Sequence, residues 1–180
     1  MQSKTSFFNR TLFRKNLSRY WPLWGFASFV GFLAPAALLV RVIQSGETSV
    51  APLRVREIYY YLVADAVPIV SIAYAILCAM AVWSYLYHPR SVSMMHSLPI
   101  RREGLFLTNL LSGLAMMAIP YLVAGGLGTL LFACCGGFDA WGTLATILAV
   151  IGQSVTFFGL ATFCAFLTGN IFALPVLYFL

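Results

Sequence analysis

The sequence predicts an all-α, polytopic transmembrane helix bundle with four complete spans, the start of a fifth and an N-terminal interfacial helix. Of its 180 residues, 61% are hydrophobic and 9% are charged, whereas soluble domains carry about a quarter charged residues. After Glu103 the only charged residue is Asp139. An apolar stretch of that length is typical of membrane spans rather than of a soluble core.

The net charge of +6 indicates orientation in a membrane rather than binding to nucleic acid. Five of the 11 basic residues fall within the first 20 positions: Lys4, Arg10, Arg14, Lys15 and Arg19. Basic residues before a first span are typical of a cytoplasmic N-terminus. The chain lacks the combined basic and aromatic surface of a nucleic-acid binder. We therefore expect no nucleic-acid partner.

Residues 1–20 form the predicted interfacial helix, and residues 21–180 form the transmembrane domain. On a helical plot of residues 4–20, an apolar side and a basic side separate, with Leu12, Phe13, Leu17 and Tyr20 on the first and Arg10, Arg14, Lys15 and Arg19 on the second. This pattern is typical of a helix lying on a bilayer with its cations toward anionic headgroups. A disordered basic leader is the alternative.

Four apolar runs are long enough to cross a bilayer. They cover residues 21–43, 62–87, 105–132 and 141–168. Aromatic residues mark two of their ends, as in membrane-interface belts: Trp21 and Trp24 at the first, and Trp83, Tyr85 and Tyr87 at the second. The third run contains Pro120 and three nearby glycines, Gly125, Gly126 and Gly128. These residues predict a bend or a thin wall in its second half.

Two further features concern the last part of the chain. Ala161, Ala165 and Gly169 are spaced four apart, which favours a close contact between helices. Residues 170–180 begin a fifth span, but 11 residues make only about 16 Å of helix. The apolar core of a bilayer is about 30 Å thick. We therefore expect the protein to continue beyond this segment.

The distribution of basic residues predicts which connectors are cytoplasmic. With the N-terminus inside, the inner segments hold eight of the Lys and Arg residues and the outer segments hold three. The inner group comprises the five N-terminal residues with Arg90, Arg101 and Arg102, and the outer group comprises Arg41, Arg54 and Arg56. This bias predicts a multi-pass protein of a bacterial cell membrane with a cytoplasmic N-terminus and a cytoplasmic connector over residues 88–104.

That connector is half apolar, which a solvated loop does not require. Between residues 91 and 98 the apolar side chains span less than half of a helical circle, and Pro99 disfavours helical geometry in the residue before it. The pattern predicts a short amphipathic docking helix. Its candidate contact residues are Val92, Met94, Met95, His96, Ser97 and Leu98, flanked by the basic residues Arg101 and Arg102. A helix that only lies on lipid is the alternative.

Two stretches carry a family resemblance. They are "HSLPIRREGLFLTNLLSG" around Pro99 and "FFNRTLFRKNLSRYWPLWG" before the first span. Together with the order of the spans, they resemble the permease subunits of type 2 ATP-binding-cassette transporters. In that family a short cytoplasmic helix joins the second and third spans. The chain departs from the family pattern at Arg101, where a helix-capping Ser or Thr is common, and many members have six spans.

The resemblance implies an export permease that forms the translocation path. Its expected partners are a separate ATP-binding-cassette ATPase subunit, docked on residues 91–98, a second permease subunit and membrane lipid. ATP hydrolysis is expected on the separate subunit, so the chain itself is not expected to be an enzyme. The resemblance does not choose among peptide, antibiotic, lipid and polysaccharide substrates.

Motif searches leave one other class open. The chain has no phosphate-loop, zinc-protease or serine-hydrolase motif, and His88 and His96 lack carboxylate partners at ligand spacing. We therefore predict no catalytic residue, no metal site and no cofactor. The alternative is a polytopic membrane enzyme or a non-transport scaffold whose functional residues lie beyond residue 180.

Overall fold

The described part of the chain is built from helices. The computed structural model describes residues 8–44, 67–87, 102–134, 140–168 and 170–180. In these ranges the regular elements are α1 (Arg10–Arg19), α2 (Trp21–Gln44), α4 (Val67–Trp83), the 3₁₀ helix η2 (Ser84–Tyr87), α6 (Arg102–Cys134), α7 (Ala140–Leu167) and α8 (Ala173–Phe179). The all-α prediction is confirmed for these residues, which contain no strand.

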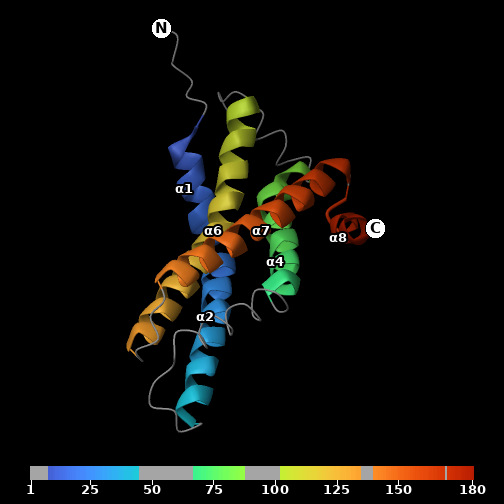
Figure 1. The fold of residues 1–180 in the computed structure, drawn as a ribbon. Coiled ribbons are helices and arrows are strands. Elements are labelled where there is room, and N and C mark those ends of the chain that lie inside the picture. The colour runs from blue at the N-terminus through green and yellow to red at the C-terminus, as the bar shows by residue number, and fades with distance from the viewer. Residues whose placement is uncertain (1–7, 45–66, 88–101, 135–139, 169) are drawn as a thin grey trace.

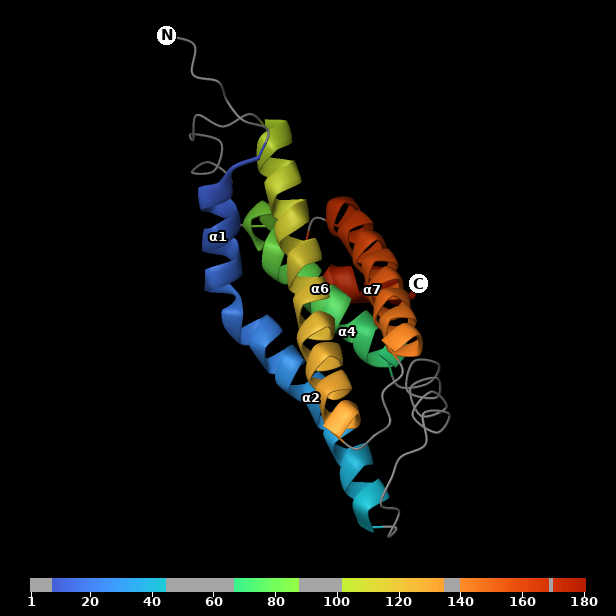
Figure 2. The same ribbon diagram turned by 60° about the vertical axis from the view of Figure 1, so that its left-hand side comes forward.

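The helices form a bundle in which α6 is the shared neighbour. α2 runs along α6, and α4, α6 and α7 pack against one another (Figures 1 and 2). α1 lies beside the first part of α6, and the short α8 packs on α7 and α4. The end of the bundle that holds α1 and the start of α6 is called the α1 end below.

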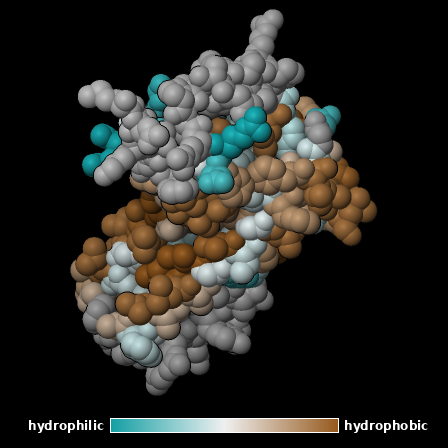
Figure 3. Space-filling view, turned by 90° about the horizontal axis from the view of Figure 1, so that it is seen from above, coloured by the Kyte–Doolittle hydropathy of each residue, from teal (hydrophilic) through white to brown (hydrophobic). Residues whose placement is uncertain are grey.

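The outer surface of the bundle is apolar. Large hydrophobic side chains are exposed along the long helices, including Phe26 at 70%, Ile69 at 72% and Leu148 at 60%. Viewed from the α1 end, hydrophobic side chains form a broad band and the hydrophilic ones occupy only part of the face (Figure 3). Since water does not favour such a surface and lipid does, the arrangement is consistent with a multi-pass membrane protein.

Three described helices are long and apolar enough to cross a bilayer. They are Val67–Tyr87, Arg102–Leu131 within α6, and Ala140–Leu167. The first predicted span corresponds to α2, whose segment Trp21–Ala37 is a shorter apolar helix. The membrane-protein class is thus supported, whereas the count of four complete spans and a partial fifth stays a prediction.

The helix boundaries differ from the predicted ones by a few residues. α6 starts three residues before the predicted span, and Glu103 in its first turn suits the positive end of the helix dipole. α1 starts only at Arg10, so the helical prediction is wrong for Phe8 and Asn9. The Asn9 side chain instead accepts hydrogen bonds from the backbone amides of Thr11 and Leu12, both at 3.1 Å. Asn9 is therefore the N-cap of α1.

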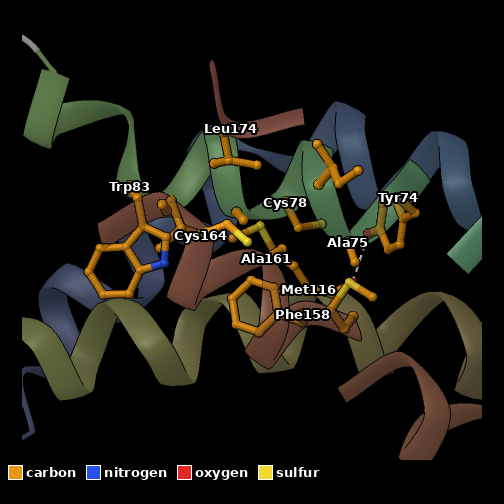
Figure 4. Close-up of a cluster of buried hydrophobic side chains, with 14 residues drawn as sticks. Tyr74, Ala75, Cys78, Trp83, Met116, Phe158, Ala161, Cys164 and Leu174 are labelled. Carbon is orange, nitrogen blue, oxygen red and sulfur yellow. Dashed lines mark hydrogen bonds between the residues drawn. The ribbon is translucent and has the colours of Figure 1, made fainter. Parts of the chain in front are cut away.

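Small residues let α4 and α7 approach closely. Ala75, Cys78 and Ala79 of α4 are buried, as are Ala161, Cys164 and Ala165 of α7 (Figure 4). The predicted close contact at Ala161 and Ala165 is therefore confirmed, while Gly169 lies outside the described residues. Small side chains at such positions gain van der Waals contact between backbones, which is the main attraction available between helices in lipid.

Trp83 has a different role from the predicted one. It is fully buried at the end of α4, stacked on Phe106 at 5.4 Å and edge-on to Phe166 at 4.8 Å between ring centroids. Its indole N–H donates to the Thr162 hydroxyl at 3.4 Å. Trp83 is thus a packing residue that joins α4, α6 and α7 rather than a lipid-facing belt residue. Trp21, 61% exposed, fits a belt position better.

Two glycines of α6 accept side chains of α7. A Cβ at Gly113 would clash with Cζ of the fully buried Phe158, and a Cβ at Gly125 would lie 2.7 Å from Cδ1 of Ile147. Gly126 has no such neighbour within 4 Å. The glycine group therefore provides a notch for α7 at Gly125, and a second notch at Gly113 fixes the Phe158 ring.

Candidate functional site at the α1 end

Most of the predicted docking residues fall outside the described part of the chain. These are Val92, Met94, Met95, His96, Ser97, Leu98 and Arg101. Arg102 is described and lies exposed at the first residue of α6. The chain leaves η2 at Tyr87 and re-enters the described structure at Arg102, and both points belong to the α1 end (Figure 1). The site can therefore be described by the helix ends that flank the connector.

A set of polar contacts joins α1 to the first part of α6. We call it the amide seam, and its members are Asn9, Asn16, Thr108, Asn109 and Ser112. The Asn9 backbone amide donates to Oγ1 of Thr108 at 3.1 Å. The side-chain amide of Asn16 donates to Oδ1 of Asn109 at 2.8 Å and to Oγ of Ser112 at 3.4 Å. α1 thus supplies the donors of the seam and α6 supplies the acceptors.

The hydroxyl groups of α6 are set up to accept because their own protons are used within the helix. Oγ1 of Thr108 donates to the Gly104 carbonyl at 2.6 Å, and Oγ of Ser112 donates to the Thr108 carbonyl at 2.7 Å. Such bonds to the preceding turn are usual for Ser and Thr inside helices. Each hydroxyl then has lone pairs left for α1. Thr108 and Ser112 are fully buried.

Asn109 is the incompletely satisfied member of the seam. It is 2% exposed, and its Oδ1 accepts from Asn16, whereas its Nδ2 has no partner with full hydrogen-bond geometry and only a weaker side-chain interaction with Tyr85. A buried donor without a partner costs about 1–3 kcal/mol. The seam therefore holds α1 with a modest net attraction. It is weaker than a fully satisfied polar network of the same size would be.

Tyrosine hydroxyls donate hydrogen bonds to backbone carbonyls in the last turns of two helices, α4 and α7. Tyr20, between α1 and α2, donates to the Ala81 carbonyl at 2.7 Å in the last turn of α4, and Ser84 donates to the same carbonyl at 2.9 Å. Tyr87 of η2 donates to the Ala165 carbonyl of α7 at 2.8 Å. The last carbonyls of a helix lack intrahelical partners. These hydroxyls satisfy them, and Tyr20 thereby links α1 to the end of α4.

α1 has an exposed charged side and a half-buried apolar side. Its four cations, Arg10, Arg14, Lys15 and Arg19, are exposed. The side chains predicted to form its apolar side, Leu12, Phe13, Leu17 and Tyr20, are half-buried, and Leu17 and Tyr20 pack against the core. α1 therefore turns its apolar side toward the protein and its cations away from it. Whether α1 also lies on lipid stays a prediction.

The amide seam was not predicted from the sequence, although signals for it were present. Asn16 lies on the apolar side of the α1 helical plot, between Leu12 and Tyr20. Thr108 and Ser112 are four residues apart in an otherwise apolar run. Polar residues on an apolar helix face require a partner, because burial without one is costly. This signal predicts that each set needs a partner, but it does not say that they pair with each other.

Comparison with known proteins adds no further assignment. The chain matched no protein-family model, no curated protein and no solved structure.

Proposed function

We propose that the chain is the membrane permease subunit of an ATP-driven exporter in a bacterial cell membrane. In this proposal the N-terminus and the α1 end face the cytoplasm, and the protein has four complete spans and part of a fifth. A separate ATP-binding-cassette ATPase subunit docks on residues 91–98, and a second permease subunit completes the translocation path. The single observation that carries the proposal is the half-apolar connector and its resemblance to the coupling segment of type 2 transporters.

The surroundings of the connector support a role in transmitting motion. Its flanking elements are tied to the rest of the bundle by specific bonds: η2 through Tyr87 to α7, the end of α4 through Tyr20 to α1, and α6 through the seam. A displacement of a docked helix would therefore act on α4, α6 and α7 together. Helix-in-groove docking concentrates binding free energy in a few apolar anchors.

Membrane lipid is the third proposed partner. The exposed cations of α1 suit anionic headgroups, and Trp21 directly after it suits the same depth.

The test of this proposal uses charge substitutions in the connector of the full-length protein. Met95→Asp and Leu98→Asp place a carboxylate in the apolar side of the predicted docking helix, and we expect at least a ten-fold loss of copurified ATPase, or on the order of 2 kcal/mol for a lost anchor. Ser93→Asp, on the polar side, is the matched control and is expected to retain binding. ATPase content is measured in mild detergent at equal membrane abundance. If both apolar-side variants copurify as much ATPase as the wild type, the proposal is wrong.

Topology is tested separately by labelling intact cells with a membrane-impermeant thiol reagent. Single cysteines at Ser3, Thr48 and Ser93 are introduced into a protein without native cysteines. We expect labelling at Thr48 alone, because the eight-to-three distribution of basic residues places the other two positions inside. Labelling at Ser93 with Thr48 silent would reverse the orientation.

A further inference from the structure

Pro120 divides α6 into two parts that are held very differently. The proximal arm, residues 102–119, contains eight buried residues: Gly104, Leu105, Thr108, Asn109, Ser112, Gly113, Met116 and Met117. In the distal arm, residues 121–134, only Ala124 and Gly128 are buried among the residues whose burial is described. Regions with few buried contacts open at low free energy. The distal arm therefore has fewer buried residues than the proximal arm, and its close contacts are Ala124 with Gly31 of α2 and Gly125 with Ile147 of α7.

The junction between the arms lacks one backbone hydrogen bond. Pro120 has no N–H, so the carbonyl of Met116, four residues earlier, has no partner in its own helix. The Tyr74 hydroxyl of α4 donates to this carbonyl at 2.8 Å (Figure 4). The unsatisfied group is thus satisfied from a neighbouring helix, as proline in a span requires. Tyr74 holds the proximal side of the junction to α4.

A second hydrogen bond holds the distal side of the junction, and here the tyrosine belongs to α6 and its partner to α4. Tyr121 of α6 shares a hydrogen bond of 2.6 Å with the hydroxyl of Ser71 on α4, and Oγ of Ser154 on α7 lies 3.4 Å from Ser71. Ser71 and Ser154 are fully buried. Ser154 uses its proton on the Val150 carbonyl at 2.8 Å. The bond between Tyr121 and Ser71 is therefore the polar tie of the distal arm to α4 among the described residues.

We propose that Pro120 is a hinge and that the bond between Tyr121 and Ser71 is its latch. With the latch closed, the distal arm lies against α4. With the latch open, the distal arm swings about Pro120 while the proximal arm stays in place. Two features favour this motion: the missing backbone bond at Pro120 and the open space at Gly126. The inference requires no ATPase and is independent of the proposed function.

The test measures distances between spin labels in the full-length protein in lipid nanodiscs. Native cysteines are replaced, and cysteines at Leu130 and Ile69, which are both exposed, report the distal arm against α4. A second pair, Leu111 and Leu160, reports the proximal arm against α7 and is also exposed. Tyr121→Phe removes only the latch hydroxyl, and Ser71→Ala removes its partner.

We expect both latch variants to raise the population of displaced distal-arm distances by about three- to ten-fold, the factor for one side-chain hydrogen bond within a membrane. The proximal pair is expected to remain as in the wild type. Adding Pro120→Ala to Tyr121→Phe restores the backbone bond and is expected to remove the displaced population. Unchanged distal distances in both latch variants would overturn the proposal. Equal broadening of the proximal pair, or no effect of Pro120→Ala, would overturn it as well.

Discussion

The contact between α6 and α7 and the contact between α1 and α6 are stabilised in different ways. The first depends on shape, because the Phe158 ring occupies the space above Gly113 and no polar bond between α6 and α7 is seen among the described residues there. The second depends on hydrogen bonds, because two donors of α1 meet three acceptors of α6. The comparison teaches that a shape-based contact cannot tolerate an added atom, whereas a polar contact cannot tolerate a missing partner.

The largest expected effect tests the shape-based contact. Gly113→Ala places a methyl group against the end of a buried ring, and overpacking of this kind typically costs about 1–3 kcal/mol, so we expect about 3 kcal/mol here. The free energy of unfolding is measured by detergent titration in mixed micelles. Gly126→Ala is the matched control, since nothing lies within 4 Å of its Cβ, and it is expected to be neutral or stabilising.

A second variant distinguishes shape from a general intolerance of Gly113 to substitution. Combining Gly113→Ala with Phe158→Leu removes the ring that causes the clash. We expect the double variant to be more stable than the sum of the two single effects predicts, because the residues are in contact. If the losses in free energy of unfolding of the two single variants add exactly in the double variant, the clash with the Phe158 ring is not the reason that Gly113 does not accept a larger side chain.

The next effect concerns the hydrogen bond from the Tyr74 hydroxyl to the Met116 carbonyl, which Pro120 leaves without a partner in its own helix. Tyr74→Phe leaves the Met116 carbonyl without a partner, and we expect a loss of about 1.5 kcal/mol in the same titration. In a Pro120→Ala background the restored amide satisfies that carbonyl, so the Tyr74→Phe loss should fall to about 0.5 kcal/mol or less. An equal loss in both backgrounds would show that the Tyr74 hydroxyl does not act through the proline.

The third effect tests the amide seam. Asn16→Leu removes one amide donor and its two hydrogen bonds, and we expect about 1 kcal/mol of local destabilisation, seen as faster hydrogen exchange in α1 but not in α7. Adding Asn109→Leu replaces the second polar partner and should restore much of the protection, since an apolar pair leaves fewer buried groups unsatisfied. Ser18→Leu, at an exposed position of α1, is the control. If the double variant exchanges faster than the single one, the seam is not a pairwise contact.

The smallest expected effect concerns the start of α1. Asn9→Ala removes the side-chain cap, and we expect about 0.5 kcal/mol, confined to the first turn, because the helix end is partly exposed. Hydrogen exchange of the amides of Thr11 and Leu12 is the measurement. Asn9→Ser keeps a capping oxygen and should retain most of the protection. Faster exchange throughout α1 would indicate that the cap and the seam act as one unit.

Much of the fold was predictable because the patterns involved are local. The predicted spans at 105–132 and 141–168 match α6 and α7 within three residues at each end, since apolar length and turn residues mark such helices. The two sides of α1 were also predictable from helical periodicity. The start of α1 was predicted too early, because the capping side chain of Asn9 outweighs the periodic pattern.

The candidate site was only partly predictable. The docking residues of the connector rest on the sequence pattern and lie outside the described structure. The partners of Asn16, Tyr20 and Tyr74 had no signal in the local sequence, because each bond joins residues at least 42 positions apart. A local pattern predicts that a buried polar group needs a partner but not which residue provides it.

The sequence by itself thus determined that the chain is an apolar helical bundle, where its long helices run, which side of α1 is charged and which end of the bundle carries the connector. Tertiary structure decided that Trp83 is enclosed rather than lipid-facing, that Gly113 accepts Phe158, and that Tyr74 satisfies the carbonyl released by Pro120. The physical reason is that apolar length and periodicity act within one helix. By contrast, close packing and the pairing of buried polar groups depend on which helices are neighbours and on how far each is shifted along its axis relative to the other.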